Sequence, residues 1–287
     1  MWTISKLTFL EIVSKRIFLI TILMTIAFVT LYGVAIHFAV QETGPMMSNT
    51  MDNALQNKFF ASQLLGVGLY FSSFITALLA ILSSVSSIAS EVDSHQIDTW
   101  LMRPISRTQF VLGKVIGLGG LLVMYAIALF ISITLIHQIV GGEMMELPIG
   151  ALQIMKAVSI FILQPIILVT LGVMLSTRMS TLNAGIVLII LYGAAFIGGF
   201  VEQIGSLMEK AALINIGIVT SLVFPVDAMY RKMTVLLFDT ADNPISFAQQ
   251  GMFASASAPS NFMIIYAISY GAIMLYIAIV TFKKRDV

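Results

Sequence analysis

Long apolar runs separated by short polar segments dominate the chain. Each run is free of formal charge over most of its length and reaches the roughly 20 apolar residues that an α-helix needs to cross the hydrocarbon core of a bilayer. The pattern therefore predicts an all-α integral membrane protein with six transmembrane helices, at about residues 17–41, 62–90, 112–138, 157–177, 182–201 and 261–282.

The segment between the fifth and sixth predicted spans is apolar but short. Residues 211–226 offer only sixteen residues before Asp227, which suits a re-entrant or interfacial helix better than a crossing. A second amphipathic piece is expected beyond Pro225. We interpret Asp227, Arg231 and Lys232 as its solvated face, with a gate as the alternative.

The first sixteen residues predict a helix that lies in the membrane interface before the first span. Trp2, Leu7, Leu10 and Val13 have the spacing of one helical face, which would enter lipid. This N-terminal elbow helix is followed by a span long enough to be retained. Within the fourth span, Pro165 predicts a kink, because proline has no N–H to donate within a helix.

Small residues recur at four-residue spacing in two of the predicted spans. Gly113 with Gly117, and Ala194 with Gly198, would allow two helix backbones to approach closely in lipid. We expect these four positions to lie at helix-packing or dimer contacts.

Composition supports the membrane class and excludes others. The chain is 59% hydrophobic and only 10% charged, which excludes an ordinary soluble domain. Its net charge is +1 and its basic residues are scattered, so no nucleic-acid partner is expected. The absence of cysteine excludes disulfides and thiolate chemistry.

The distribution of basic residues predicts the orientation in the membrane. With six spans both termini lie on one side, which then holds ten of the fifteen Lys and Arg residues. The positive-inside rule therefore predicts cytoplasmic termini. It also predicts that the charged segment from Glu91 to Lys114 is cytoplasmic.

This charged segment lies between the second and third spans. Ile97, Trp100 and Leu101 fall on one stripe of a short amphipathic helix. Pro104 ends that helix, and the capping-box pattern of Ser106 and Gln109 predicts a new helix from about Arg107. The pattern alone leaves two interpretations open, a docking element for another protein and a solvated loop between two spans.

Motifs for catalysis are missing from the sequence. It has no phosphate-binding GxxxxGK[ST] and neither GxSxG nor HExxH, so an enzyme is not expected. No ionisable residue falls near the middle of a predicted span, which disfavours ion-coupled transport. Energy for any transport is therefore expected from a separate partner.

Methionine and histidine residues near the predicted outer side raise a weaker alternative. Thioether and imidazole groups bind Cu(I), but methionine is also a common packing residue, so we assign no metal site. The residues concerned are Met46, Met47, Met51, Met144, Met145, Met229, Met233, Met252, His37 and His137.

Two stretches carry a resemblance to a known family. The first runs from Glu91 through RPISR at residues 103–107 to Gly113 and Lys114, and the second is SLVFPVDAMYR at residues 221–231. Together with the span order, they resemble type 2 ABC exporter permeases. The resemblance is greatest to permeases for the maturation of multicopper enzymes.

The resemblance implies a single permease domain over residues 1–287 that dimerises in a bacterial or archaeal inner membrane. Two copies of a cytoplasmic ABC ATPase would bind ATP and Mg²⁺, and this chain would bind no cofactor. The charged segment would be the coupling helix that docks on the ATPase. Its expected anchors are Ile97, Trp100 and Leu101, and its expected polar rim is Glu91, Asp93, Asp98, Arg103 and Arg107. A non-transporting anchor or sensor that recruits a cytoplasmic protein is the alternative function.

Overall fold

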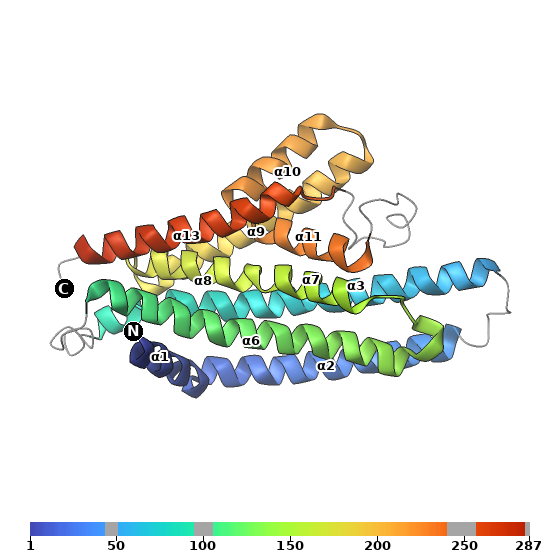
Figure 1. Cartoon of the computed structure of the whole chain (residues 1–287), viewed down its shortest axis with the longest axis horizontal. Coiled ribbons are helices and arrows are strands. Elements are labelled where there is room, and N and C mark those ends of the chain that lie inside the picture. Colours follow the sequence, from blue (N-terminus) through green and yellow to red (C-terminus); the bar gives the residue numbers. More distant parts are fainter. Residues whose placement is uncertain (44–50, 95–105, 240–256, 285–287) are drawn as a thin grey trace.

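The computed structural model in Figure 1 describes residues 1–43, 51–94, 106–239 and 257–284. Within these ranges the chain is helical and has no strand, as predicted. The elements are α1 (Trp2–Ser14), α2 (Arg16–Thr43), α3 (Met51–Val85), α4 (Ala89–Asp93), α6 (Arg107–Gly141), the 3₁₀ helix η2 (Gly142–Met145), α7 (Ala151–Phe161), α8 (Leu163–Ser176), α9 (Thr181–Leu207), α10 (Ala211–Val223), α11 (Val226–Phe238) and α13 (Asn261–Lys284).

Within the described residues, six stretches of helix are long and apolar enough to cross a bilayer, the predicted number, with the bent pair α10–α11 counted apart. Their mean hydropathy lies between 2.1 and 2.4. They cover Arg16–Gln41, Asn57–Val92, Arg107–Gly141, Ala151–Ser176, Thr181–Leu207 and Asn261–Lys284. The long helices α2, α3, α6 and α13 run side by side along the long axis of the molecule (Figure 1).

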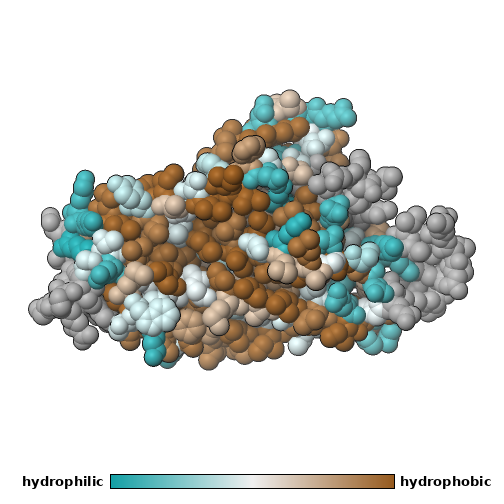
Figure 2. Space-filling model, in the orientation of Figure 1, coloured by the Kyte–Doolittle hydropathy of each residue, from teal (hydrophilic) through white to brown (hydrophobic). Residues whose placement is uncertain are grey.

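The outer surface of this bundle suits a lipid environment. Figure 2 shows a broad apolar surface across the middle of the molecule, with hydrophilic residues gathered toward its ends. Large apolar side chains such as Leu19, Leu31 and Ile190 are more than 60% exposed. Such exposure is expected where lipid, and not water, surrounds a helix.

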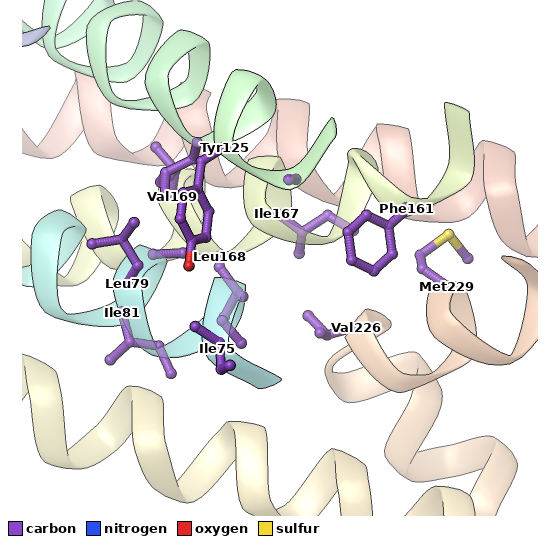
Figure 3. Packing of buried hydrophobic residues seen from close by; sticks show 14 of the residues in the cluster. Ile75, Leu79, Ile81, Tyr125, Phe161, Ile167, Leu168, Val169, Val226 and Met229 are labelled. Carbon is purple, nitrogen blue, oxygen red and sulfur yellow. The ribbon is translucent and has the colours of Figure 1, made fainter. Parts of the chain in front are cut away.

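The centre of the bundle is formed by α3 and by the α7–α8 span. In each, 67% of the most apolar window is buried, against 11% for α2 and 17% for α13. Figure 3 shows how Leu79 and Ile81 of α3, Tyr125 of α6 and Leu168 of α8 gather in this core. The spans at the periphery are therefore those with the most lipid-facing surface.

Polar side chains within the spans find partners on neighbouring helices. Ser73 Oγ on α3 donates to Gln164 Oε1 on α8 at 2.7 Å. The hydroxyl of Tyr32 on α2 lies 3.1 Å from His137 Nδ1 on α6. Because lipid offers no competing partner, such bonds help to fix the pairing of helices in a membrane.

The fourth span is interrupted at Ile162, where α7 ends and α8 begins. The break lies in the turn that precedes Pro165, whose missing N–H leaves the carbonyl of Phe161 without its normal helical donor. The helix is interrupted where the sequence predicts a kink, and the bend itself remains a prediction.

The helices α10 and α11 form a pair bent by 108°, which confirms the expected interruption between the last two spans. Close contact with α9 determines the path of α10. A Cβ built at Gly198 would lie 1.8 Å from Thr220 Oγ1, and one at Gly217 would lie 2.7 Å from the carbonyl oxygen of Gly198. The glycines at these positions thus allow the backbones of α9 and α10 to approach.

We predict opposite effects for two Gly→Ala substitutions on α9. Gly198→Ala should destabilise the protein by about 1–3 kcal/mol, because the added methyl meets Thr220. Gly193→Ala should stabilise it by about 0.5–1 kcal/mol, because no atom lies within 4 Å of the added carbon and alanine favours the helix. Thermal unfolding in one detergent compares them, and equal shifts would contradict the packing described.

Candidate functional site

The described ends of the predicted docking segment, α4 and the first turn of α6, lie at the end of the bundle where α1 begins and α13 ends (Figure 1). The helix α4 precedes it and α6 follows it. Asp93 belongs to α4. The expected anchors Ile97, Trp100 and Leu101, and the rim residues Asp98 and Arg103, lie outside the described residues. The structure therefore describes the two ends of this segment.

A buried ion-pair cluster joins the first end to the rest of the bundle. Lys114 on α6 is 3% exposed and Glu91 on α4 is 6% exposed, and the Lys114 ammonium donates to Glu91 Oε1. The same ammonium donates to Glu11 Oε2 on α1 at 3.1 Å. Glu91 was expected on the polar rim of the segment, whereas its carboxylate is directed inward. Its contact with an ATPase remains a prediction.

Two glycines allow α1 to lie across α6 and bring Glu11 to Lys114. A Cβ at Gly113 would lie 2.7 Å from Ile4 Cγ2, and one at Gly117 would lie 2.6 Å from the carbonyl oxygen of Ser5. Ile4 is buried there, while Trp2 on α1 is 79% exposed. The elbow helix thus presents an apolar outer face, as expected, and packs on α6 through the predicted close-packing positions.

Hydroxyl groups hold α4 against α8. The backbone N–H groups of Ile88 and Ala89 donate to Ser176 Oγ at 3.1 and 2.8 Å. These donors belong to the first turn of α4, whose N–H groups have no partner within the helix. The serine-rich end of α3 also approaches α8 closely, since a Cβ at Gly172 would lie 2.0 Å from Ser84 Oγ.

The second end of the segment is fixed by a helix cap and by the end of the last span. Ser106 Oγ accepts a hydrogen bond from the N–H of Gln109, which confirms the predicted start of α6 at Arg107. Arg107 Nη1 donates to the carbonyl oxygens of Phe282 and Lys283 at 3.4 and 3.1 Å. The ring of Phe110 stacks on that of Phe282 at 5.5 Å. A cation at the last turn of α13 also matches the helix dipole.

The positive charges of Lys114 and Lys15 favour the ionised form of Glu11. Burial raises the pKa of Glu11, but the charges of Lys114 and Lys15 outweigh this effect, so its pKa is lowered overall. A lowered pKa means that Glu11 stabilises the folded state at neutral pH and loses this contribution as the pH falls through the lowered pKa. Glu11 is partly exposed, so the contribution is small.

Of the four predicted packing positions, three lie in contacts within the chain. Gly113 and Gly117 face α1, and Gly198 faces α10. Ala194 on α9 is exposed. Dimer contacts at these positions remain a prediction.

A second buried charge cluster, at the bent helix pair, was missed from the sequence. Arg231 on α11 is 2% exposed and binds Asp227 Oδ2 at 2.9 Å and Glu202 Oε2 on α9 at 2.8 Å. The interpretation of Asp227, Arg231 and Lys232 as a solvated face was therefore wrong. The sequence feature that could have predicted this ion pair was the four-residue spacing of Asp227 and Arg231 on a helix rich in apolar residues. The fifth span was predicted to end at residue 201, but α9 extends through Glu202 to Leu207.

Histidine and carboxylate side chains do not form a metal-binding cluster among the described residues. No group of three or more His, Asp or Glu residues is positioned there to hold a metal ion. His37 Nε2 lies 3.1 Å from Gln41 Nε2, and His137 is paired with Tyr32. Met46, Met47 and Met252 lie outside the described residues.

Comparison with known proteins gives one clear match. The family model described as ABC-2 family transporter protein matches residues 2–287, nearly the whole chain. No curated protein matches the sequence.

We predict that replacing one partner of the buried Lys114–Glu91 ion pair destabilises the protein more than replacing both partners with apolar residues. Lys114→Met should destabilise the protein by about 3–5 kcal/mol, because Glu91 stays buried without its partner. The double variant Lys114→Met/Glu91→Leu should recover most of this loss. Lys15→Met, which removes the partly exposed partner of Glu11, should cost less than about 1 kcal/mol. Thermal unfolding of the three variants measures the difference, and additive losses in the double variant would contradict the prediction.

Proposed function

The chain belongs to the ABC-2 family of transporter proteins, and from this premise we propose that it couples ATP hydrolysis in a partner to export across the membrane. Family membership and the six apolar spans make it a multi-pass ABC transporter permease that works with an ABC ATPase. The proposal adds three points: the coupling segment, the direction of transport and the assembly.

Ion pairs and hydrogen bonds hold both ends of the charged segment to neighbouring helices. This observation supports the coupling proposal. Glu91 and Lys114 join α4 to α6 and, through Glu11, to α1. Ser176 joins α4 to α8, and Arg107 joins α6 to α13. A force applied between residues 94 and 106 therefore reaches four spans through short polar contacts. A solvated loop that transmitted no force would not need its two ends held by such contacts.

We propose that the ATPase applies this force. Ile97, Trp100 and Leu101 would bury an apolar anchor in a groove on the ATPase, with Asp93, Asp98 and Arg103 at the polar rim. ATP and Mg²⁺ would bind to the ATPase. When two ATPases close on ATP, the docked segments would move with them and tilt the spans, which alternates access to a cleft between two permease copies.

The proposed orientation places this end of the bundle in the cytoplasm of a bacterium or archaeon. The first residues of α1 and the last turn of α13 lie at one end (Figure 1), and that turn carries Lys283 and Lys284. Basic residues next to spans favour the cytoplasmic side. The finer resemblance, to permeases for multicopper enzyme maturation, remains a prediction, as does the export direction.

We predict that Trp100→Ala weakens binding of the ATPase by about tenfold or more, because large buried aromatic anchors dominate interfaces of this kind. The chain has only two tryptophans, so Trp2→Ala is a matched control. Trp2 lies on the exposed face of α1, and its loss should leave binding unchanged. Co-purification and titration of the ATPase with each permease variant measure the effect. Equal binding by both variants would contradict the docking proposal, and a stable partner without nucleotide binding would favour an anchor or sensor.

We predict that Ser106→Cys is protected from a membrane-impermeant maleimide in intact cells, whereas Glu146→Cys is labelled. Both positions are exposed, and the chain has no cysteine of its own, so each label reports one site. After cell lysis both should react. Labelling of Ser106→Cys in intact cells would place the charged segment outside and overturn the proposal.

A further inference from the structure

The bent helix pair brings an acidic side chain into the interior of the bundle. Asp227 lies in the first turn of α11, next to the bend of 108°. A Cβ at Gly199 on α9 would lie 1.8 Å from Asp227 Oδ2, so the carboxylate lies against the backbone of a span. Its neighbours Val226 and Met229 belong to the apolar core (Figure 3). The carboxylate of Asp227 therefore lies among helices.

A small cavity lies beside this carboxylate. Its lining includes Tyr70 and Ser73 of α3, Gln164 of α8, Tyr192 of α9, and Asp227 and Tyr230 of α11. Ser73, Gln164 and Tyr192 each lie near the middle of their apolar span. The cavity is therefore close to the middle of the bilayer, where the sequence alone predicted no ionisable residue.

The walls of this cavity combine oxygen atoms with aromatic rings. The rings of Tyr70 and Tyr230 meet edge to face with centroids 5.3 Å apart, and the ring of Tyr70 lies 5.8 Å from that of Phe196. Carboxylate, hydroxyl and amide oxygens are ligands for hard cations, and aromatic rings attract cations to their faces. The lining thus suits a cation better than an anion or an apolar group.

The ion pairs around Asp227 leave one negative charge in excess. Arg231 Nε donates to Asp227 Oδ2 at 2.9 Å, and its Nη2 donates to Glu202 Oε2 at 2.8 Å. The next cation along α11, Lys232, donates to the carbonyl oxygen of Pro259 at 2.9 Å. One guanidinium therefore serves two carboxylates. Because a buried charge without compensation is costly, a bound monovalent cation would stabilise this arrangement.

The size of the cavity limits what it can bind. Its volume is about 10 Å³, which is enough for one particle of about the size of a water molecule. We propose that Asp227 and the residues around this cavity form a binding site for one dehydrated monovalent cation of the size of potassium or ammonium. Oxygen atoms of the lining replace the water shell of the ion, and Asp227 supplies the opposite charge. The bound ion holds α11 against α3, α8 and α9.

The experiment measures ion binding by the purified chain, without an ATPase, in nanodiscs of phosphatidylcholine, a lipid without net charge. Radioactive rubidium is the probe, because it resembles potassium in size and charge, and unlabelled salts compete with it at constant ionic strength. The parent chain should bind rubidium saturably, and potassium or ammonium should displace it. Tetramethylammonium should not displace it, because this ion is too large for the cavity.

Asp227→Asn should weaken rubidium binding by about tenfold or more, because it removes the charge that attracts the ion. The asparagine oxygen can still accept from Arg231, so this contact is retained. Glu209→Gln is the matched control, because it makes the same change at an exposed acid just beyond α9, and it should bind rubidium as the parent does. If Asp227→Asn does not fold, Tyr192→Phe keeps the ring that lines the cavity but removes its hydroxyl, and it should also weaken binding.

Thermal unfolding in the same nanodiscs gives a second readout. A ligand that binds only the folded state stabilises it. Replacing tetramethylammonium with potassium should therefore raise the melting temperature of the parent and of Glu209→Gln. The same replacement should leave the melting temperature of Asp227→Asn unchanged.

Equal rubidium binding by the folded parent and by Asp227→Asn would overturn the proposal, as would an absence of saturable binding. Stabilisation of the parent by a lower pH but not by potassium would also overturn it, because the compensating charge would then be a proton. Since no ATPase is present, none of these results bears on the coupling proposal.

Discussion

A lipid bilayer offers no partner to a buried polar group, so nearly all such side-chain atoms in the described part of the chain are paired within the protein, with Glu91 Oε2 and His137 Nε2 as exceptions. This constraint explains why the charged residues gather in two places. Lys114 joins Glu91 and Glu11 at the end of the bundle where α1 begins and α13 ends. Arg231 joins Glu202 and Asp227 at the bent helix pair. In both clusters an ion pair joins separate helices, Lys114 with Glu91 and Glu11 in one and Arg231 with Glu202 in the other, so these pairs also determine which helices lie together.

Small residues make these polar contacts possible. Gly113 and Gly117 bring α1 within reach of Lys114, and a Cβ at Gly199 would lie 1.8 Å from Asp227 Oδ2. The hydrophobic effect does not drive helices together inside lipid. Close backbone contact and hydrogen bonds therefore contribute more of the free energy of helix association. The glycines thus permit the close backbone contacts that bring the charged side chains of the ion pairs together.

The spans and their interruptions could be predicted because each depends on nearby residues. Hydropathy predicts the six spans, Pro165 the break in the fourth and Ser106 the start of α6. The ion pairs depend on residues 23 and 29 positions apart in sequence, Glu91 with Lys114 and Glu202 with Arg231. A charge pattern alone does not tell whether a carboxylate faces water or a buried cation. For this reason Glu91 was expected at the rim and Arg231 at a solvated surface.

The contact between α1 and α6 also bears on how the protein is made. Glu11 and Lys114 are 103 residues apart, so α1 leaves the ribosome long before its partner helix is synthesised. Glu11 and Glu91 both precede Lys114 in the sequence, so translation supplies the two carboxylates before the lysine that pairs with them. The cluster can therefore close only once α6 has been made, which ties assembly of the N-terminal half to the direction of translation.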